Sequence, residues 1–263
     1  MPLSSQQIIT RFNRAASTYD EASSLQREMA DALLDRFTQG MLESDQHDSK
    51  MHIADLGCGT GYLLDQLQQR GFNKLHGFDI AGDMLNAVHA CTANASVKLT
   101  EADLQALPVP DEQFDVVFSN AAIQWCDTAR AAKEIQRILR PGGRGFVSTF
   151  GPQTLQQWRN VFESHGHSSV HRFESLEQLT AKFSDSGLRL SQVETKLVTQ
   201  SFDNVKEMFD SIKKLGASNA AAIRKPISKS VYQSIHTEFQ QQLARDGILK
   251  ITFEAISFEA VRP

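Results

Sequence analysis

The sequence predicts an α/β fold built on a mostly parallel sheet of seven strands, with the last strand antiparallel and helices on both faces. Three observations lead to this prediction. Short apolar segments alternate with amphipathic ones along the chain. A glycine-rich turn, I-A-D-L-G-C-G-T-G at residues 53–61, joins the first apolar segment to the amphipathic segment after it. The second apolar segment ends in an acid, as a strand beside a ligand site often does.

The apolar segments between residues 51 and 150 are expected to form the parallel strands. Residues 51–56 predict a buried strand, and residues 62–69, with leucines on one side, predict the helix that follows. Further strands are expected at residues 75–78, 97–99, 114–120 and 145–150. The last of these follows R-P-G-G at residues 140–143, which we interpret as the turn that ends a helix.

Two regions lie outside this core. In residues 1–40, Leu25, Met29, Leu33 and Phe37 recur every four residues, as in a helix that lies on the main domain. We expect this region to form a lid. In residues 153–244 we expect a substrate cap, and a closing strand at residues 249–261 should complete a Rossmann-like sheet in one domain, 1–263. Within the cap, helices are expected at 155–163, 176–183, 205–215 and 231–243, around a strand at 188–198.

The glycine turn indicates a nucleotide-cofactor site. It joins the end of a strand to the start of a helix, where backbone N–H groups lack intrahelical partners and glycine lets the chain approach a ligand closely. A dinucleotide fingerprint G-x-G-x-x-G would need a glycine at position 62, which is Tyr62. The spacing therefore weakens the prediction of NAD.

The turn resembles motif I of the class I S-adenosylmethionine (SAM) methyltransferases, in which an acid precedes G-x-G-x-G. The resemblance implies SAM as the cofactor and S-adenosyl-L-homocysteine as its product, with the loop under the methionine part. The loop residues that it assigns to the cofactor are Asp55, Gly57, Cys58, Gly59 and Gly61.

Acids after the next two strands predict contacts with the nucleoside. Asp79 lies about 20 residues beyond the glycines, where carboxylates commonly hold ribose hydroxyls. Ile80 and Met84 resemble the apolar residues that flank the adenine in this family. Asp103, followed by Leu104, fits the family's acceptor of the adenine amino group by position alone.

The end of the strand at residues 114–120 is expected to face the methyl group. Asn120 and Trp125 are predicted to contact the cofactor there, and Gln124 is a catalytic candidate. The motif N/D-P-P-Y/F, which amino-group methylases of DNA, glutamine and some RNA bases carry at this strand end, is absent from the sequence. Exocyclic nitrogen is therefore not the expected acceptor.

Three segments narrow the resemblance to malonyl-acyl carrier protein O-methyltransferases of biotin synthesis. They are R-F-N-R-A-A-S-T-Y-D at residues 11–20 with L-Q-R-E at 25–28, H-R-F at 171–173, and I-K-K-L-G-A-S-N at 212–219. The resemblance covers nearly the whole chain. Family members commonly have His where this chain has Asn219, so the departure leaves a role for that side chain in doubt.

The resemblance implies methylation of the free carboxylate of a malonyl thioester. A carboxylate, with a reference pKa of about 4, is ionised at neutral pH, so its attack on the methyl group needs no general base. Alignment and exclusion of water would then lower the barrier by roughly 7–11 kcal/mol. Tyr19 is the first candidate for orienting donor and acceptor, Gln26 for the methionyl end, and Arg172 for a forked contact with the carboxylate.

Charge and composition bear on partners and location. The chain of 263 residues carries a net charge of −4, which does not favour nucleic acid. It has neither a signal-like N-terminus nor an apolar run of membrane-spanning length, so no membrane contact and a cytoplasmic location are expected. Residues 211–230 contain five basic residues and no acid, which indicates either a solvated face or a dock for an acidic carrier protein. The docking candidates are Lys213, Lys214, Arg224 and Lys225.

No metal is expected. The three cysteines, including Cys91 and Cys126, are too few and too irregular for a zinc site or a disulfide framework. The tract H-G-H-x-x-x-H at residues 165–171 lacks converging carboxylates or cysteines, and we interpret it as a solvated turn around Gly166. Cys58 fits the glycine loop by its small size, although a helix N-terminus could make it somewhat reactive.

Other functions fit the same residues. One is a SAM-dependent methyltransferase of another small carboxylate, or of a quinone or phenol hydroxyl; a phenol would need a base that S-N-A-A-I-Q-W at residues 119–125 does not supply. Another is a SAM-binding protein without catalysis, which would keep the same loop and acids. Only turnover separates binding from catalysis.

Overall fold

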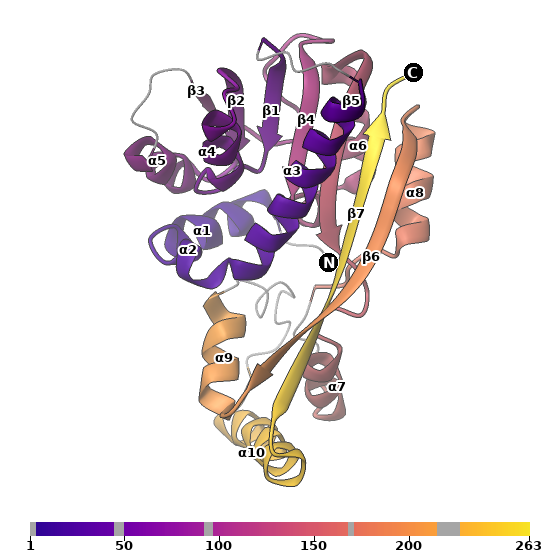
Figure 1. Cartoon of the computed structure of the whole chain (residues 1–263). Coiled ribbons are helices and arrows are strands. Elements are labelled where there is room, and N and C mark those ends of the chain that lie inside the picture. Colours follow the sequence, from indigo (N-terminus) through magenta and orange to yellow (C-terminus); the bar gives the residue numbers. More distant parts are fainter. Residues whose placement is uncertain (1–3, 45–49, 92–96, 168–170, 215–226) are drawn as a thin grey trace.

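The computed structural model describes residues 4–44, 50–91, 97–167, 171–214 and 227–263. A seven-stranded sheet with the strand order β3-β2-β1-β4-β5-β7-β6 forms its centre (Figure 1). The strand β7 runs antiparallel to both of its neighbours, whereas the other pairs are parallel. The predicted fold class is confirmed, including the antiparallel last strand.

The strands agree closely with the apolar segments of the sequence. Two predicted strands, residues 114–120 and 249–261, match to the residue. The strands are β1 (His52–Leu56), β2 (Lys74–Asp79), β3 (Val97–Glu101), β4 (Phe114–Asn120), β5 (Leu139–Phe150), β6 (Arg189–Phe202) and β7 (Leu249–Val261).

The start of β5 differs from the prediction. Residues 140–143 were predicted as a turn before a strand at 145–150, but the strand begins at Leu139. The register with β4 shifts between Phe114, which pairs with Leu139, and Val116, which pairs with Arg144. The Pro-Gly-Gly segment therefore bulges out of the ladder, and Gly142 takes a φ of 77° in it.

The helices fill the intervals between strands. The predicted helix at residues 62–69 is α4, and the expected helices around β6 are present within a few residues of their predicted ends. The helices are α1 (Ser5–Ala15), α2 (Tyr19–Ala22), α3 (Ser24–Ser44), α4 (Tyr62–Gln69), α5 (Gly82–Cys91), the 3₁₀ turn η1 (Ile123–Trp125), α6 (Thr128–Ile138), α7 (Gln156–Ser164), α8 (Leu176–Asp185), α9 (Val205–Lys214) and α10 (Lys229–Asp246).

Alternate strand residues face opposite layers of helices, as the period of two requires. On one face, Ile53 and Phe118 are fully buried in a cluster with Phe37 of α3 and leucines of α4. On the other face, Leu56 and Val117 belong to a cluster with residues of α6 and α8. In Figure 1, α3, α4 and α5 cover one side of the sheet, and α6 lies on the other.

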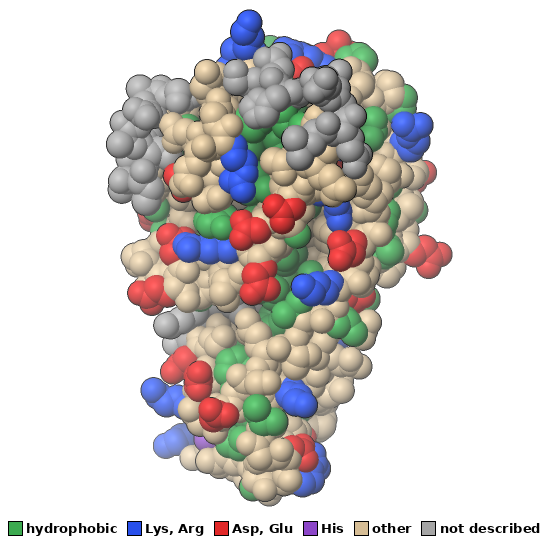
Figure 2. Space-filling view, viewed as in Figure 1, with side chains coloured by type: hydrophobic (Ala, Val, Ile, Leu, Met, Phe, Trp, Pro, Cys, Tyr) green, Lys and Arg blue, Asp and Glu red, His purple; other side chains and the backbone are tan. Residues whose placement is uncertain are grey.

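The N-terminal segment crosses the first of these faces. All four apolar residues of the predicted period in α3 are buried, with Leu25 and Met29 in one cluster and Leu33 and Phe37 in another. On the surface of this segment basic and acidic side chains are interspersed (Figure 2), as in the ion pairs Arg27–Asp20 and Arg36–Glu194, each 3.2 Å long. The helix α3 therefore ties the N-terminal segment to two parts of the core.

The strands β6 and β7 run on beyond the rest of the sheet toward α7, α9 and α10 (Figure 1). The apolar cluster there centres on Trp158 of α7, whose ring lies 4.7 Å from that of Phe162 and 4.5 Å from that of Phe209 in α9. The helix α8 is placed differently, because its Phe183 packs on Phe258 of β7 in the main core.

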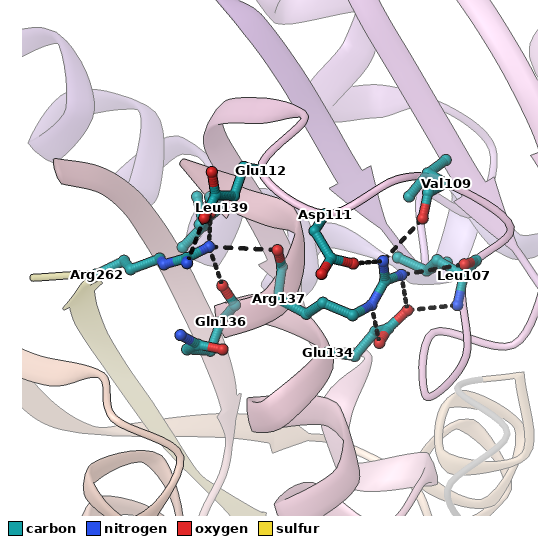
Figure 3. A network of polar contacts seen from close by, with 9 residues as sticks. All are labelled: Leu107, Val109, Asp111, Glu112, Glu134, Gln136, Arg137, Leu139 and Arg262. Atoms are coloured by element: carbon teal, nitrogen blue, oxygen red, sulfur yellow. Dashed lines mark hydrogen bonds and ion pairs between the residues drawn. The ribbon is translucent and has the colours of Figure 1, made fainter. Parts of the chain in front are cut away.

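Two arginines anchor α6 to the loop before β4 (Figure 3). Arg137 pairs with Glu134 and Asp111, each at 2.6 Å, and donates to the carbonyls of Leu107 and Val109. Arg262 donates to three carbonyls at the end of α6 and pairs with Glu112 at 2.7 Å. This network fixes the loop that runs from β3 to β4.

None of the helices in the described part of the chain is long and apolar enough to cross a bilayer.

Candidate functional site

An inner pocket lies at the carboxyl ends of β1, β2 and β4. The strand order turns at β1, with β2 on one side and β4 on the other, and such a switch point opens a crevice between the loops. Residues of α1 and α2 form part of its wall. The predicted site residues that line it are Tyr19, Gly57, Gly59, Asp79, Ile80, Met84, Asp103, Leu104, Asn120 and Trp125.

The glycine loop needs its glycines for two reasons. Gly57, Gly59 and Gly61 have φ values of 73°, 53° and 88°, a region that other residues rarely adopt. A Cβ atom at Gly57 would lie 2.4 Å from that of Ala122, and one at Gly61 would lie 2.8 Å from Cγ1 of Val88. At Gly59, by contrast, no such overlap exists, and the residue lines the pocket.

Asp79 ties the end of β2 to this loop. Its carboxylate accepts hydrogen bonds from the backbone N–H of Gly59 at 2.9 Å and of Ala81 at 2.8 Å. Burial raises the pKa of Asp79, and the backbone N–H donors oppose that rise. Because an ionised carboxylate offers about four lone-pair positions, Asp79 can also accept from hydroxyl groups of a ligand in the pocket.

The remaining walls of the pocket suit a flat heterocycle. Ile80, Met84 and Leu104 supply apolar surface. Asp103 stands beside them, and its carboxylate accepts from the backbone and side-chain amides of Gln105 at 2.9 and 3.0 Å. Apolar walls with one acceptor, opposite a carboxylate suited to hydroxyl groups, fit the adenosine part of SAM.

Two predicted cofactor residues, Asp55 in β1 and Cys58 in the glycine loop, do not line the pocket. Asp55 is 1% exposed, and neither carboxylate oxygen has a hydrogen-bond partner among the described residues. Burial, with the charge of Asp79 adding to it, raises the pKa of Asp55 to about 8. Cys58 is also buried, and burial raises the pKa of its thiol well above the usual value, so the expected reactivity at the helix N-terminus is wrong.

Gly61 and Gln26 also lie outside the pocket lining. Gly61 is the residue before α4, where it packs against Val88 of α5. Gln26 accepts from the side-chain amide of Asn120 through its backbone carbonyl at 2.9 Å, while Ser148 donates to the amide oxygen of Asn120 at 2.6 Å. The nitrogen and the oxygen of the Asn120 amide are thus both bonded to protein groups, and Gln26 takes part through its backbone carbonyl.

Phe12 of α1 lies between Tyr19 and Trp125 of η1, and all three rings line the pocket. Phe12 lies edge-on to Tyr19, with ring centroids 6.4 Å apart, and edge-on to Trp125 at 5.6 Å. The Tyr19 hydroxyl has no hydrogen-bond partner in the described part of the chain. Burial, reinforced by the charges of Asp79 and Asp20, raises the pKa of Tyr19 to about 12. The hydroxyl is therefore a neutral donor that faces the pocket.

An outer pocket adjoins the inner one. Trp125 and Asp103 line both, as do Ser5 and Ile8 of α1. The outer pocket contains the two other predicted catalytic residues, Gln124 and Arg172. The Gln124 side chain is fixed, because its amide donates to the carbonyl of Ala121 at 2.7 Å and accepts from the Thr149 hydroxyl at 3.0 Å. Arg172 is exposed.

The histidine tract forms the predicted turn around an exposed Gly166, but His171 lies apart from that turn. Its ring lies 5.5 Å from that of Trp125 and 5.0 Å from that of Phe173, in the wall of the outer pocket. Burial lowers the pKa of His171, although a hydrogen bond with the backbone of Gln124 opposes this, so the imidazole is neutral at pH 7. His165, by contrast, pairs with Glu238 at 2.9 Å.

The predicted docking residues cannot be placed around this site. Arg224 and Lys225 lie outside the described residues, and so do the side chains of Lys213 and Lys214. The segment L-G-A-S-N, residues 215–219, also lies outside the described residues. Within the described ranges, no three His, Cys, Asp or Glu side chains converge as metal ligands would.

The sequence predicts a lid in residues 1–40, but the residues of α1 that line the two pockets were not identified from it. Ser5, Ile8 and Phe12 line the inner pocket from this helix. The signal was present, because Ser4 and Gln7 form a capping box and Ile8 and Phe12 are spaced by four residues. In the outer pocket, Thr128, Arg130, Thr149, Glu174 and Lys182 were also missed.

Comparison with known proteins agrees with this geometry. A family model described as a methyltransferase domain matches residues 54–147. The malonyl-[acyl-carrier protein] O-methyltransferase of Halorhodospira halophila is 33% identical over 253 residues, which cover 93% of this chain and 83% of that protein. The enzyme of the same name from Methylovorus sp. is 31% identical over 264 residues, with 96% and 87% covered. The crystal structure of the YcgJ protein from Bacillus subtilis is similar in fold, with a TM-score of 0.61 at 18% identity, over 84% of this chain and 96% of that one.

Proposed function

The chain belongs to the malonyl-[acyl-carrier protein] O-methyltransferase family, and on this premise we propose that it methylates the free carboxylate of a malonyl thioester on acyl carrier protein. It is an enzyme, and its methyl donor is SAM. The methyl ester that it forms would enter biotin synthesis, in which the masked charge lets the acyl chain be extended toward the pimeloyl precursor.

The junction of the two pockets at Trp125 carries this proposal. The inner pocket offers the features that adenosine requires, and the outer pocket has a mixed polar and apolar lining that includes Arg172. A methyl donor in the inner pocket and an acidic acyl group in the outer one would meet beside Trp125 and Gln124. A site built for SAM binding alone would not need the second pocket.

The proposed transfer needs no proton to move. A carboxylate oxygen forms a bond to the methyl carbon as the bond from that carbon to sulfur breaks, and the electron pair of the broken bond stays on sulfur. The residues of the outer pocket therefore have to align the carboxylate and exclude water, rather than activate it. His171 would remain a neutral hydrogen-bonding group in this scheme.

We assign three residues to alignment. The Tyr19 hydroxyl is a free donor at the inner pocket, and the Gln124 side chain is fixed at the junction. Arg172 would attract the malonyl carboxylate from its exposed position. A fully buried ion pair there would stabilise the ground-state carboxylate and slow its methylation, so a partly solvated contact suits the reaction better.

We further propose that α1 acts as a lid. It lines both pockets with Ser5 and Ile8, and Ile8 is the one residue of this helix that is buried. Toward α5, the Asn13 side chain accepts a hydrogen bond from the backbone N–H of Asp83, 3.1 Å long. A helix that buries so little of its own side-chain surface can open for exchange and close to exclude water.

The test is to supply SAM and carrier protein bearing malonyl, acetyl or no acyl group, and to follow the mass of each carrier. A gain of one methyl group on the malonyl form alone is expected, because acetyl offers no free carboxylate. A gain on the acetyl or unacylated carrier would contradict the proposal. So would no gain at all from a protein that binds SAM in calorimetry, which would favour a hydroxyl or another carboxylate as acceptor.

A further inference from the structure

Two arginines at the outer pocket have no acidic partner in the described part of the chain. Arg130 of α6 and Arg172 both line it, and both are exposed. Within the described ranges, neither guanidinium forms an ion pair or a hydrogen bond. If Arg172 takes the carboxylate, Arg130 is left as a second cation at the same pocket.

The acids of the pocket form no ion pair with Arg130, and each bonds to another group. Asp127 accepts from the backbone N–H groups of Ala129 and Arg130 at the start of α6, at 3.0 and 3.2 Å. Glu174 pairs with Lys182 at 2.6 Å. Asp103 accepts from Gln105. The guanidinium of Arg130 thus lacks an acidic partner although three carboxylates line the same pocket.

We propose that Arg130 binds the phosphate group of a phosphorylated pantetheine arm, and that this contact recognises the thioester beyond its malonyl end. The inference rests on the proposed function, since the malonyl thioester of a carrier protein or of coenzyme A is attached to such an arm. Arginine suits this ligand, because its planar fork can donate two parallel hydrogen bonds to phosphate oxygens.

The test uses two substrates that differ by the phosphate alone, malonyl-pantetheine and malonyl-4′-phosphopantetheine. The wild-type enzyme should prefer the phosphorylated one by about tenfold in kcat/KM, the effect of one charge-assisted hydrogen bond. Arg130→Gln should bring that ratio close to one, and Arg130→Lys should keep part of it. High salt should lower the wild-type ratio, because the contact is exposed. Arg189→Gln, at an exposed arginine of β6, is the matched control and should keep the full ratio.

Malonyl-coenzyme A and malonyl-carrier protein then identify the source of the phosphate. A loss of kcat/KM in Arg130→Gln with either substrate supports the site, and the larger loss shows which arm it serves. A wild-type ratio of one, or a ratio unaffected by Arg130→Gln, overturns this inference and leaves the proposed function intact. Absence of turnover with all four thioesters overturns both.

Discussion

The carboxylate of Asp79 accepts a hydrogen bond from the backbone N–H of Gly59 at 2.9 Å, and so joins the end of β2 to the glycine loop after β1. The same carboxylate accepts from Ala81 and faces the inner pocket. One side chain therefore shapes the loop and presents acceptors to the ligand. Loss of its charge should affect both.

Asp79→Asn should weaken SAM binding about ten- to a hundredfold. The amide replaces one accepting oxygen by a donor, so either a backbone N–H or a ribose hydroxyl loses its partner, at a cost of about 1–3 kcal/mol. Calorimetric titration with SAM measures this. Asp83→Asn, an exposed acid in the first turn of α5, is the control and should bind as the wild type does. Equal affinities for Asp79→Asn and wild type would remove Asp79 from the cofactor site.

Tyr19→Phe should lower kcat about tenfold without changing its dependence on pH. With a pKa of about 12, Tyr19 keeps its proton throughout the usual assay range and can orient a group but not act as a base. Initial rates between pH 6 and 9 check both statements. Tyr62→Phe removes a hydroxyl that bonds to Asp31 away from the pockets, and it should retain full activity. A new pH dependence in Tyr19→Phe would contradict the orienting role.

Asp55→Asn should stabilise the protein without ligand, and more so as the pH rises. The pKa of Asp55 in the folded state is about 8, against an ordinary value near 4, so between these values the folded chain holds a proton that the unfolded chain releases. The wild-type free energy of unfolding therefore falls as the pH rises through this window, on the order of 1 kcal/mol per pH unit. The variant lacks that slope.

Urea unfolding of both proteins at pH 5.5 and 8.5 measures this effect. The free energy of unfolding of Asp55→Asn should exceed that of the wild type by more at pH 8.5 than at pH 5.5. Asp35→Asn removes an exposed acid from α3 and should leave the slope as it is in the wild type. Parallel pH profiles for Asp55→Asn and wild type would mean that the Asp55 carboxyl is solvated or paired in solution.

Arg137→Met should destabilise the fold by about 2–4 kcal/mol at pH 7, since it leaves Glu134 nearly buried without its partner. Burial raises the pKa of Glu134, but the hydrogen bonds from Arg137 and from the backbone of Leu107, together with the charge of Arg137, lower the pKa on balance. Chemical unfolding measures the loss, and Glu134→Gln in the same chain should recover part of it. Arg189→Met should be neutral. A loss of similar size in Arg189→Met would show that the network in Figure 3 adds little.

The parts of the fold that could be predicted are those in which one local pattern determines the secondary structure. The strand β4 and the helix α4 match to the residue because their apolar periods are unambiguous. The start of β5 was predicted wrongly, because Pro-Gly-Gly is typical of a turn and of a bulge alike, and only pairing with β4 distinguishes them.

The inner pocket could be predicted further than the outer one. Asp79 and Asp103 follow strands whose carboxyl ends must lie at one edge of a parallel sheet. Arg130 and His171 reach the outer pocket from segments about 40 residues apart, which meet only because α8 packs on the α6 side of the core. No local pattern contains that contact, and the solvated interpretation of His171 failed for this reason.

The position of the transferred methyl group shows directly whether the enzyme methylates the malonyl carboxylate. Malonyl-carrier protein is incubated with SAM labelled with ¹³C in the methyl group, and the acyl product is read by carbon NMR. Transfer to the free carboxylate, which we expect, gives a methyl ester on oxygen. A methyl group on the central carbon of the malonyl unit, or on the carrier protein itself, would contradict it.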